Sequence, residues 1–158
     1  VAVQPAAGGT VASWRPGGDS CNEVAFVDSN QSFSVTLGQV GAWQDIGWCS
    51  RSVGVNTSGW IGPLPKYIGF QGPGKAWLYR NNHGHPGGLF KLSTLPSDES
   101  PGVPYGQAYG PGNNVTAVRH PAVAGTPGDR LEFFVDGNSQ GIVPLMGRLP
   151  HDVVGCVT

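Results

Sequence analysis

Residues 131–143, LEFFVDGNSQGIV, carry the strongest fold signal in this chain. Two strand-like runs, 131–135 and 141–143, flank the tripeptide Asp136-Gly137-Asn138. An Asp-Gly pair between apolar runs is typical of a β-hairpin, because the tight turn needs residues that accept a positive φ. We therefore predict an antiparallel hairpin over 131–143, with its tip at 136–138 and a positive φ at Gly137.

Upstream of this hairpin, residues 31–37, QSFSVTL, alternate strictly between polar and apolar side chains. Phe33, Val35 and Leu37 fall on one face, since side chains on a strand repeat every two residues. Further short apolar runs are found at 24–27, 43–48, 66–70, 75–80, 89–92 and 115–119. Residues 96–114 contain four prolines and four glycines, which would interrupt a ladder, so we expect a long loop there.

Glycine and proline separate these runs without a fixed period, and together they make up 40 of the 158 residues (26 + 14). No helical periodicity extends beyond about two turns. Short strands divided by tight turns are typical of an all-β sandwich or barrel. We predict a single domain over 1–158, a β-sandwich or flattened barrel with about eight to eleven strands and less than about 10% helix. Residues 1–18 are expected to form an N-terminal arm or edge strand.

The low charge of the chain narrows the classes of partner. Charged residues make up 12% of the sequence and the net charge is −1, with no basic block that could neutralise phosphates. We therefore expect no nucleic-acid partner. No apolar run approaches the ~20 residues of a membrane span, so no membrane span is expected either. We expect a monomer.

Several features predict a secreted, extracellular protein. The chain begins at Val1 rather than Met, which suggests a processed N-terminus, although a trimmed start would give the same first residue. Asn30, Asn56 and Asn114 each begin an Asn-X-Ser/Thr acceptor triplet for glycosylation. The three cysteines allow one disulfide and one thiol, and the sequence leaves all three pairings open.

Three kinds of residue are candidates for a site. His83 and His85 could point two imidazoles to one face of a strand, but their Gly, Pro and Asn neighbours favour an ordinary turn, so no metal or other cofactor is predicted. If the protein is an enzyme, Glu132 and Asp136 would be the acidic pair for glycoside hydrolysis. Trp60 and Tyr105 lie in Gly/Pro-rich stretches and are the exposed aromatic candidates for binding.

Short segments of the chain resemble the thaumatin-like family of β-sandwiches. The matching segments are 21–26, 33–39, 89–93, 129–137, 142–144 and 153–156. The resemblance implies a sandwich fold and joins Cys21 to Cys156, which leaves Cys49 as a buried thiol beside Trp48. In size and composition the chain also resembles the small secreted elicitor proteins with which plant-pathogenic fungi trigger a hypersensitive response.

The resemblance departs from the thaumatin-like pattern where an acidic cleft is expected. Lys91 stands at a position expected to be acidic, and Glu132 is one residue out of step with Asp136. We therefore expect a secreted, non-enzymatic protein that acts at a cell surface or cell wall, either as an elicitor or effector or by binding a glycan. Its partner would be a host cell-surface protein or a cell-wall glycan. The alternatives are a weak β-glucan hydrolase of the thaumatin-like type and a carbohydrate-binding module.

Overall fold

The computed structural model describes residues 2–5, 12–13, 25–27, 31–38, 43–50, 76–82, 87–93 and 103–157 of the chain. Within these ranges there are twelve strands and no helix, one strand more than the upper end of the predicted range. None of the described residues therefore belongs to a helix that could span a membrane. The predicted strand at 66–70 lies outside the described residues.

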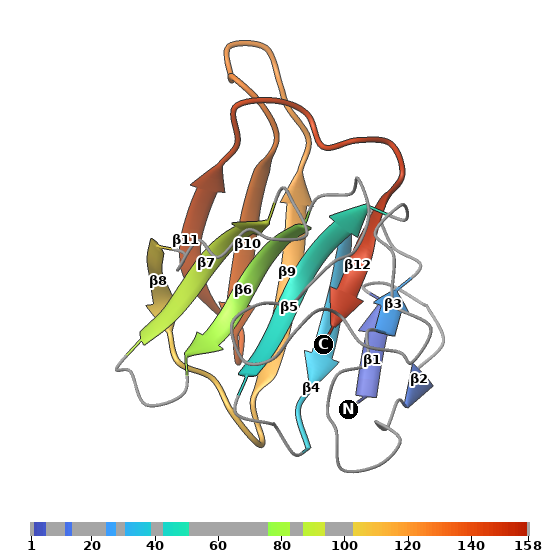
Figure 1. Ribbon diagram of the computed structural model, residues 1–158, viewed down its shortest axis with the longest axis vertical. Helices are drawn as coiled ribbons and strands as arrows, with labels where there is room; N and C mark the ends of the chain where they lie inside the picture. The colour runs from blue at the N-terminus through green and yellow to red at the C-terminus, as the bar shows by residue number, and fades with distance from the viewer. Residues whose placement is uncertain are drawn as a thin grey trace.

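The strands form two six-stranded antiparallel sheets that pack face to face (Figure 1). The first sheet has the order β11 (Asn138–Pro144), β10 (Arg130–Val135), β9 (Asn114–His120), β4 (Ser32–Thr36), β1 (Ala2–Pro5) and β2 (Ala12–Ser13). The second has the order β3 (Ala25–Val27), β12 (Val153–Val157), β5 (Trp43–Ser50), β6 (Ala76–Asn82), β7 (Gly87–Ser93) and β8 (Val103–Gln107). The predicted all-β sandwich is thereby confirmed.

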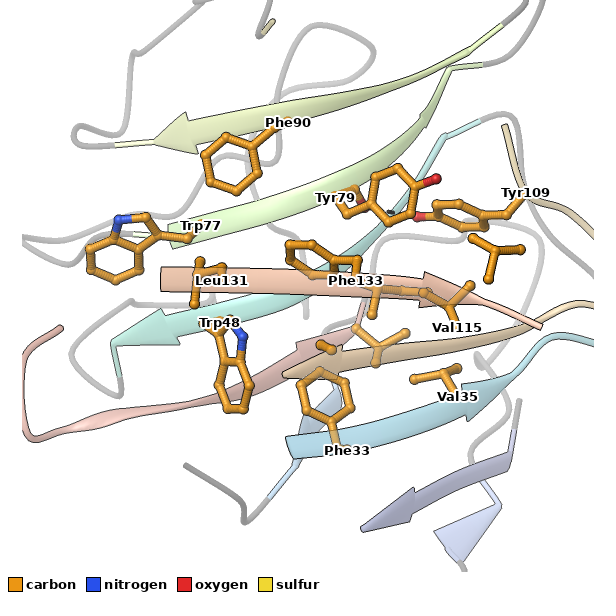
Figure 2. Packing of buried hydrophobic residues seen from close by; sticks show 14 of the residues in the cluster. Phe33, Val35, Trp48, Trp77, Tyr79, Phe90, Tyr109, Val115, Leu131 and Phe133 are labelled. Carbon is orange, nitrogen blue, oxygen red and sulfur yellow. Dashed lines mark hydrogen bonds between the residues drawn. The ribbon is translucent and has the colours of Figure 1, made fainter. Parts of the chain in front are cut away.

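The core lies between the two sheets and follows the predicted alternation. Phe33 and Val35 of β4 are fully buried, as are the alternate residues of β10. The ring of Phe33 meets that of Trp48 from β5 edge to face, with centroids 5.1 Å apart, a favoured aromatic geometry that joins the sheets (Figure 2). Tyr79 of β6 and Phe133 of β10 make a second aromatic contact across the core, at 5.3 Å.

The hairpin forms as predicted, with a two-residue turn. Asp136 and Gly137 have φ of 50° and 80°, and Asn138 already belongs to β11. Positive φ at both central residues is the mark of a type I′ turn, whose twist matches that of the flanking strands. The Asp-Gly pair therefore sets the register of β10 against β11.

We expect Gly137→Val to lower the free energy of unfolding by about 1–2 kcal/mol, because a β-branched residue is strained at positive φ. A Cβ at this position would have no atom within 4 Å, so the cost comes from backbone conformation alone. Urea unfolding measures it. Gly137→Asn is the control and should lose much less, since Asn tolerates this conformation. Equal midpoints for Gly137→Val and the wild type would contradict the turn.

Strand β8 forms within residues 96–114, where a loop was expected. Pro104 cannot donate to a ladder, but β8 is the last strand of its sheet, and an edge strand has one unpaired side that tolerates proline. The Gln107 amide donates to the Gln140 side-chain oxygen of β11 at 2.8 Å. β8 thus meets β11 where the edges of the two sheets approach each other. The loop prediction was wrong for this segment.

Two of the cysteines are neighbours in the second sheet. In the ladder of β5 and β12, Cys49 lies opposite Val154 and Cys156 lies opposite Gly47, which places both thiols on one face. Both are free and buried, and a hydrogen bond joins them. Burial raises the pKa of the Cys156 thiol well above its ordinary value, and the contact with Cys49 raises it further. A free Cys156 differs from the predicted bridge to Cys21, a residue that lies outside the described ones.

Candidate interaction surface

Two loops lie together at one end of the sandwich. Residues 121–129 connect β9 to β10, and residues 145–152 connect β11 to β12. Figure 1 shows both loops at the same end of the molecule, above the tips of these strands. Loops carried on a rigid sheet are the usual place for recognition, and in this protein hydrogen bonds hold the two loops in position.

The carboxylate of Asp129 joins the two loops. Its Oδ1 accepts a hydrogen bond from the Ala122 amide, and its Oδ2 accepts one from the Leu149 amide, each at 2.8 Å. The Arg119 guanidinium donates to Oδ2 through Nη2 at 2.8 Å and Nε at 3.1 Å. Asp129 is only 1% exposed. Groups from β9 and from both loops therefore converge on one buried side chain.

Backbone contacts reinforce this junction. The Asp129 amide donates to the Gly147 carbonyl at 3.0 Å, and the Leu145 amide donates to the Asp129 carbonyl at 2.9 Å. A Cβ at Gly128 would overlap the backbone of Gly147 and Leu145, so only glycine fits the close approach of the two loops. The two loops thus form one connected frame.

Burial alone would raise the pKa of Asp129, but the amides of Leu149 and Ala122 and the guanidinium of Arg119 outweigh it. They hold the pKa below its ordinary value of 3.8. Asp129 therefore stays charged at neutral pH. A charged, fully bonded carboxylate fixes the loops more firmly than a neutral one, since hydrogen bonds to ionised groups are the stronger ones.

This frame holds two apolar side chains in solvent. Met146 is 92% exposed and Val123 is 58% exposed. Val123 nevertheless lies in a turn that hydrogen bonds hold in place. The Val123 amide donates to the Thr126 hydroxyl at 3.0 Å, and the Val123 carbonyl accepts from the Thr126 amide and hydroxyl. We call Val123, Met146 and the exposed Arg148 the end-loop surface. Apolar side chains held out in solvent are typical of interaction sites.

The predicted acidic residue Glu132 lies on the outer face of the first sheet, where it binds two neighbours. His120 Nε2 and Glu132 Oε2 are 2.8 Å apart, and the Ser139 hydroxyl donates to Glu132 Oε1 at 2.5 Å. The hydrogen bond from Ser139 and the contact with His120 hold the pKa of Glu132 below its ordinary value, against the opposing effect of burial. A glycosidase acid needs a raised pKa, so this environment suits Glu132 poorly for that role.

The other predicted acidic residue, Asp136, has different partners. Its carboxylate accepts from the Asn113 side-chain amide at 2.6 Å and from the Asn114 backbone amide at 2.7 Å. These bonds fasten the hairpin turn to the start of β9. Among the described residues, Glu132 and Asp136 share no hydrogen-bond partner, and these two acidic side chains hold separate parts of the fold.

Tyr105 is partly buried, whereas the sequence predicted an exposed side chain, and its role in binding stays a prediction. Its hydroxyl donates to the Gly141 carbonyl at 2.6 Å and accepts from the Phe133 amide at 3.3 Å. Its ring meets Tyr79 edge to face, with centroids 5.2 Å apart. Burial raises the pKa of Tyr105 to about 12. Tyr105 thus joins the edge strand β8 to the hairpin. The sequence placed this residue in a loop, so this contact was not predicted.

Most of the remaining predicted residues lie outside the described part of the chain. They are Trp60, His83, His85 and two of the acceptor asparagines, Asn30 and Asn56. Asn114 begins β9, and its side-chain amide donates to the Thr36 hydroxyl at 3.1 Å. Within the ranges that the structure describes, no three His, Cys, Asp or Glu side chains cluster as a metal site would require.

Sequence reasoning missed Asp129 and Met146 as the centre of a site. Asp129 follows Gly128 just before a strand, so its sequence context indicates a simple turn. Met146 is the one methionine in the chain and lies between Leu145 and Gly147 in the stretch after the hairpin. With Leu145 and Leu149 nearby, the sequence offers no signal that singles out Met146 as exposed.

No protein-family model matches this chain, and no curated protein matches it. Among solved structures, the chain is similar to a human SPRY domain, with a TM-score of 0.50 and 17% sequence identity. The alignment covers 89% of this chain and 79% of that domain. At this identity the likeness concerns the fold alone.

The structural match corrects the resemblance drawn from short sequence segments. The similar fold is that of a SPRY domain, and neither a thaumatin-like protein nor an elicitor is found. A strand, an Asp-Gly turn and a second strand occur in many antiparallel sandwiches, so these segments identify a hairpin rather than a family. The thaumatin-like resemblance was wrong, and the Cys21–Cys156 pairing loses the argument that came from it.

Proposed function

We propose that this chain is a protein-recognition domain without catalytic activity, which binds its partner through the end-loop surface. The observation that carries the proposal is the exposure of Met146 and Val123 on loops that Asp129 fixes. A preorganised surface loses little conformational freedom on binding, which leaves more of the contact energy for affinity. A flexible methionine adapts to the shape of a partner.

Two further points support recognition over catalysis. Among the described residues, Ser139 and His120 both bind Glu132 rather than each other, so His120 is not placed to take a proton from Ser139. The SPRY-like sandwich favours a protein-interaction role as an analogy of fold. The expected extracellular location stays a prediction.

The test is a comparison of aspartate substitutions at matched exposed residues. The domain is used to capture partners from an extract of its source, and binding is then measured with the purified partner. We expect Met146→Asp and Val123→Asp each to weaken binding by about tenfold or more, as the loss of an apolar contact and the burial of a charge would do. Val103→Asp is the control, because Val103 is 59% exposed, close to the 58% of Val123, and lies on β8.

Selective loss of binding in the two end-loop variants, with Val103→Asp unchanged, would support the proposal. Wild-type affinity in both end-loop variants, or a loss confined to Val103→Asp, would contradict it. Thermal unfolding of all three variants checks that each remains folded.

A further inference from the structure

Arg148 of the end-loop surface and Arg130 beside it have no carboxylate partner among the described residues. Arg130 follows Asp129 and Arg148 follows Gly147, and the Asp129 amide donates to the Gly147 carbonyl at 3.0 Å. The two arginines therefore extend from neighbouring stretches of backbone. Neither of them forms an ion pair in the described part of the chain.

The side chain of Arg130 points to the outer face of the first sheet. Its neighbour Leu131 is fully buried in the core, and successive residues on a strand point to opposite faces. In the ladders Arg130 lies between His120 of β9 and Pro144 of β11. Its Nε is buried and has no hydrogen-bond acceptor, so no internal oxygen holds the guanidinium at that atom.

The other two described arginines each form an ion pair with a buried aspartate, which Arg130 and Arg148 do not. Arg80 pairs with Asp45, and Arg119 pairs with Asp129. The nearest carboxylates to Arg130 along the chain are already bonded, Asp129 as described above and Glu132 by His120 and Ser139. Asp152, in the same loop as Arg148, has an interaction of its own. Arg130 and Arg148 are therefore the two arginines at this end of the molecule with which no described carboxylate forms an ion pair.

We propose that the partner of the end-loop surface is an acidic protein segment with an apolar anchor. Its carboxylates bind the guanidinium groups of Arg130 and Arg148, while its apolar side chain packs on Met146 and Val123. A guanidinium suits this role because its planar donors match both oxygens of a carboxylate. Like charges would instead repel a basic segment. This inference depends on the proposed function and specifies the chemistry of the partner.

The test is a selection of random displayed peptides on the wild-type domain, followed by screening against Met146→Asp and Val103→Asp. Peptides that need Met146 but not Val103 report on the end-loop surface. We expect this set to be enriched in Asp and Glu beside a large apolar residue. An end-loop set that is neutral or basic would overturn the acidic partner and leave the proposed function standing. An empty set would count against both.

Affinity measurements on one such peptide then test the two arginines. We expect Arg148→Gln to weaken binding several-fold and Arg130→Gln/Arg148→Gln to weaken it roughly tenfold or more. Arg148→Lys keeps the charge but loses the paired planar donors, so its affinity should lie between those of the wild type and Arg148→Gln. Peptides with Asn and Gln in place of Asp and Glu should bind the wild type and the double variant equally. Unchanged affinity in both Arg148→Gln and the double variant would overturn the contact between the arginines and the acidic segment. Because Arg148 is exposed, we expect Arg148→Gln to leave the fold intact.

Discussion

Asp129→Asn is expected to lower the free energy of unfolding by about 3–5 kcal/mol, the range found when one partner of a buried ion pair is removed. The Asp129 side chain is 2% exposed and that of Arg119 is 17% exposed, so solvent replaces little of what is lost. The asparagine amide keeps the shape but presents an NH₂ group where an oxygen accepted hydrogen bonds. The amide of Ala122 or of Leu149 would then lose its acceptor.

The effect of pH distinguishes the charge of Asp129 from its shape. The folded pKa of Asp129 lies below its ordinary value of 3.8, so its contribution is fully present above that value and is lost as the pH falls through the folded pKa. The stability difference between the wild type and Asp129→Asn should therefore be largest at neutral pH and shrink below about pH 4. Urea unfolding at several pH values measures it.

Asp136→Asn is the control for this prediction. Asp136 also accepts two hydrogen bonds, but it is exposed, so its loss should cost about 1 kcal/mol or less. Equal small losses for Asp129→Asn and Asp136→Asn would show that the loop junction is weak. The end-loop surface would then lack the rigid support that the proposed function requires.

The fold class could be predicted because its signals are local. The alternation at Phe33 and Val35 and the Asp-Gly turn each depend on a few adjacent residues, and the structure confirms both. β8 could not be predicted because Pro104 is compatible with a strand only at an edge, and the order of strands in a sheet is not written in any one segment. Local signals were likewise insufficient to identify a family.

The candidate site was hard to predict because its contacts join distant segments. Asp129 binds Arg119 before it and Leu149 twenty residues after it, and no short motif records such a convergence. Glu132 and Asp136 are close in sequence, which suggested a shared acidic site, yet their hydrogen bonds fasten different parts of the fold. Proximity along a strand and turn is therefore poor grounds for a catalytic pair.

The second large effect is expected at the buried pair of Asp45 and Arg80, which lie opposite each other on β5 and β6. Arg80 Nε and Nη2 donate to the two carboxylate oxygens at 2.9 Å each, and Asp45 is 0% exposed. Burial opposes the charge on Arg80, but Asp45 outweighs it and raises the pKa of the guanidinium. Both residues are buried although their neighbours Ile46 and Tyr79 are the ones that face the core.

Arg80→Met should lower the free energy of unfolding by about 3–5 kcal/mol, because it leaves the Asp45 carboxylate buried without its bidentate partner. Asp45→Leu should be similarly costly, since it strands the guanidinium instead. The double variant Arg80→Met/Asp45→Leu buries neither charge, so we expect it to lose much less than the sum of the single losses. Urea unfolding of the four proteins completes the cycle. Additive losses would mean that the two charges do not stabilise each other. The ion pair would then not explain how Asp45 and Arg80 can be buried in a protein with so few charged residues.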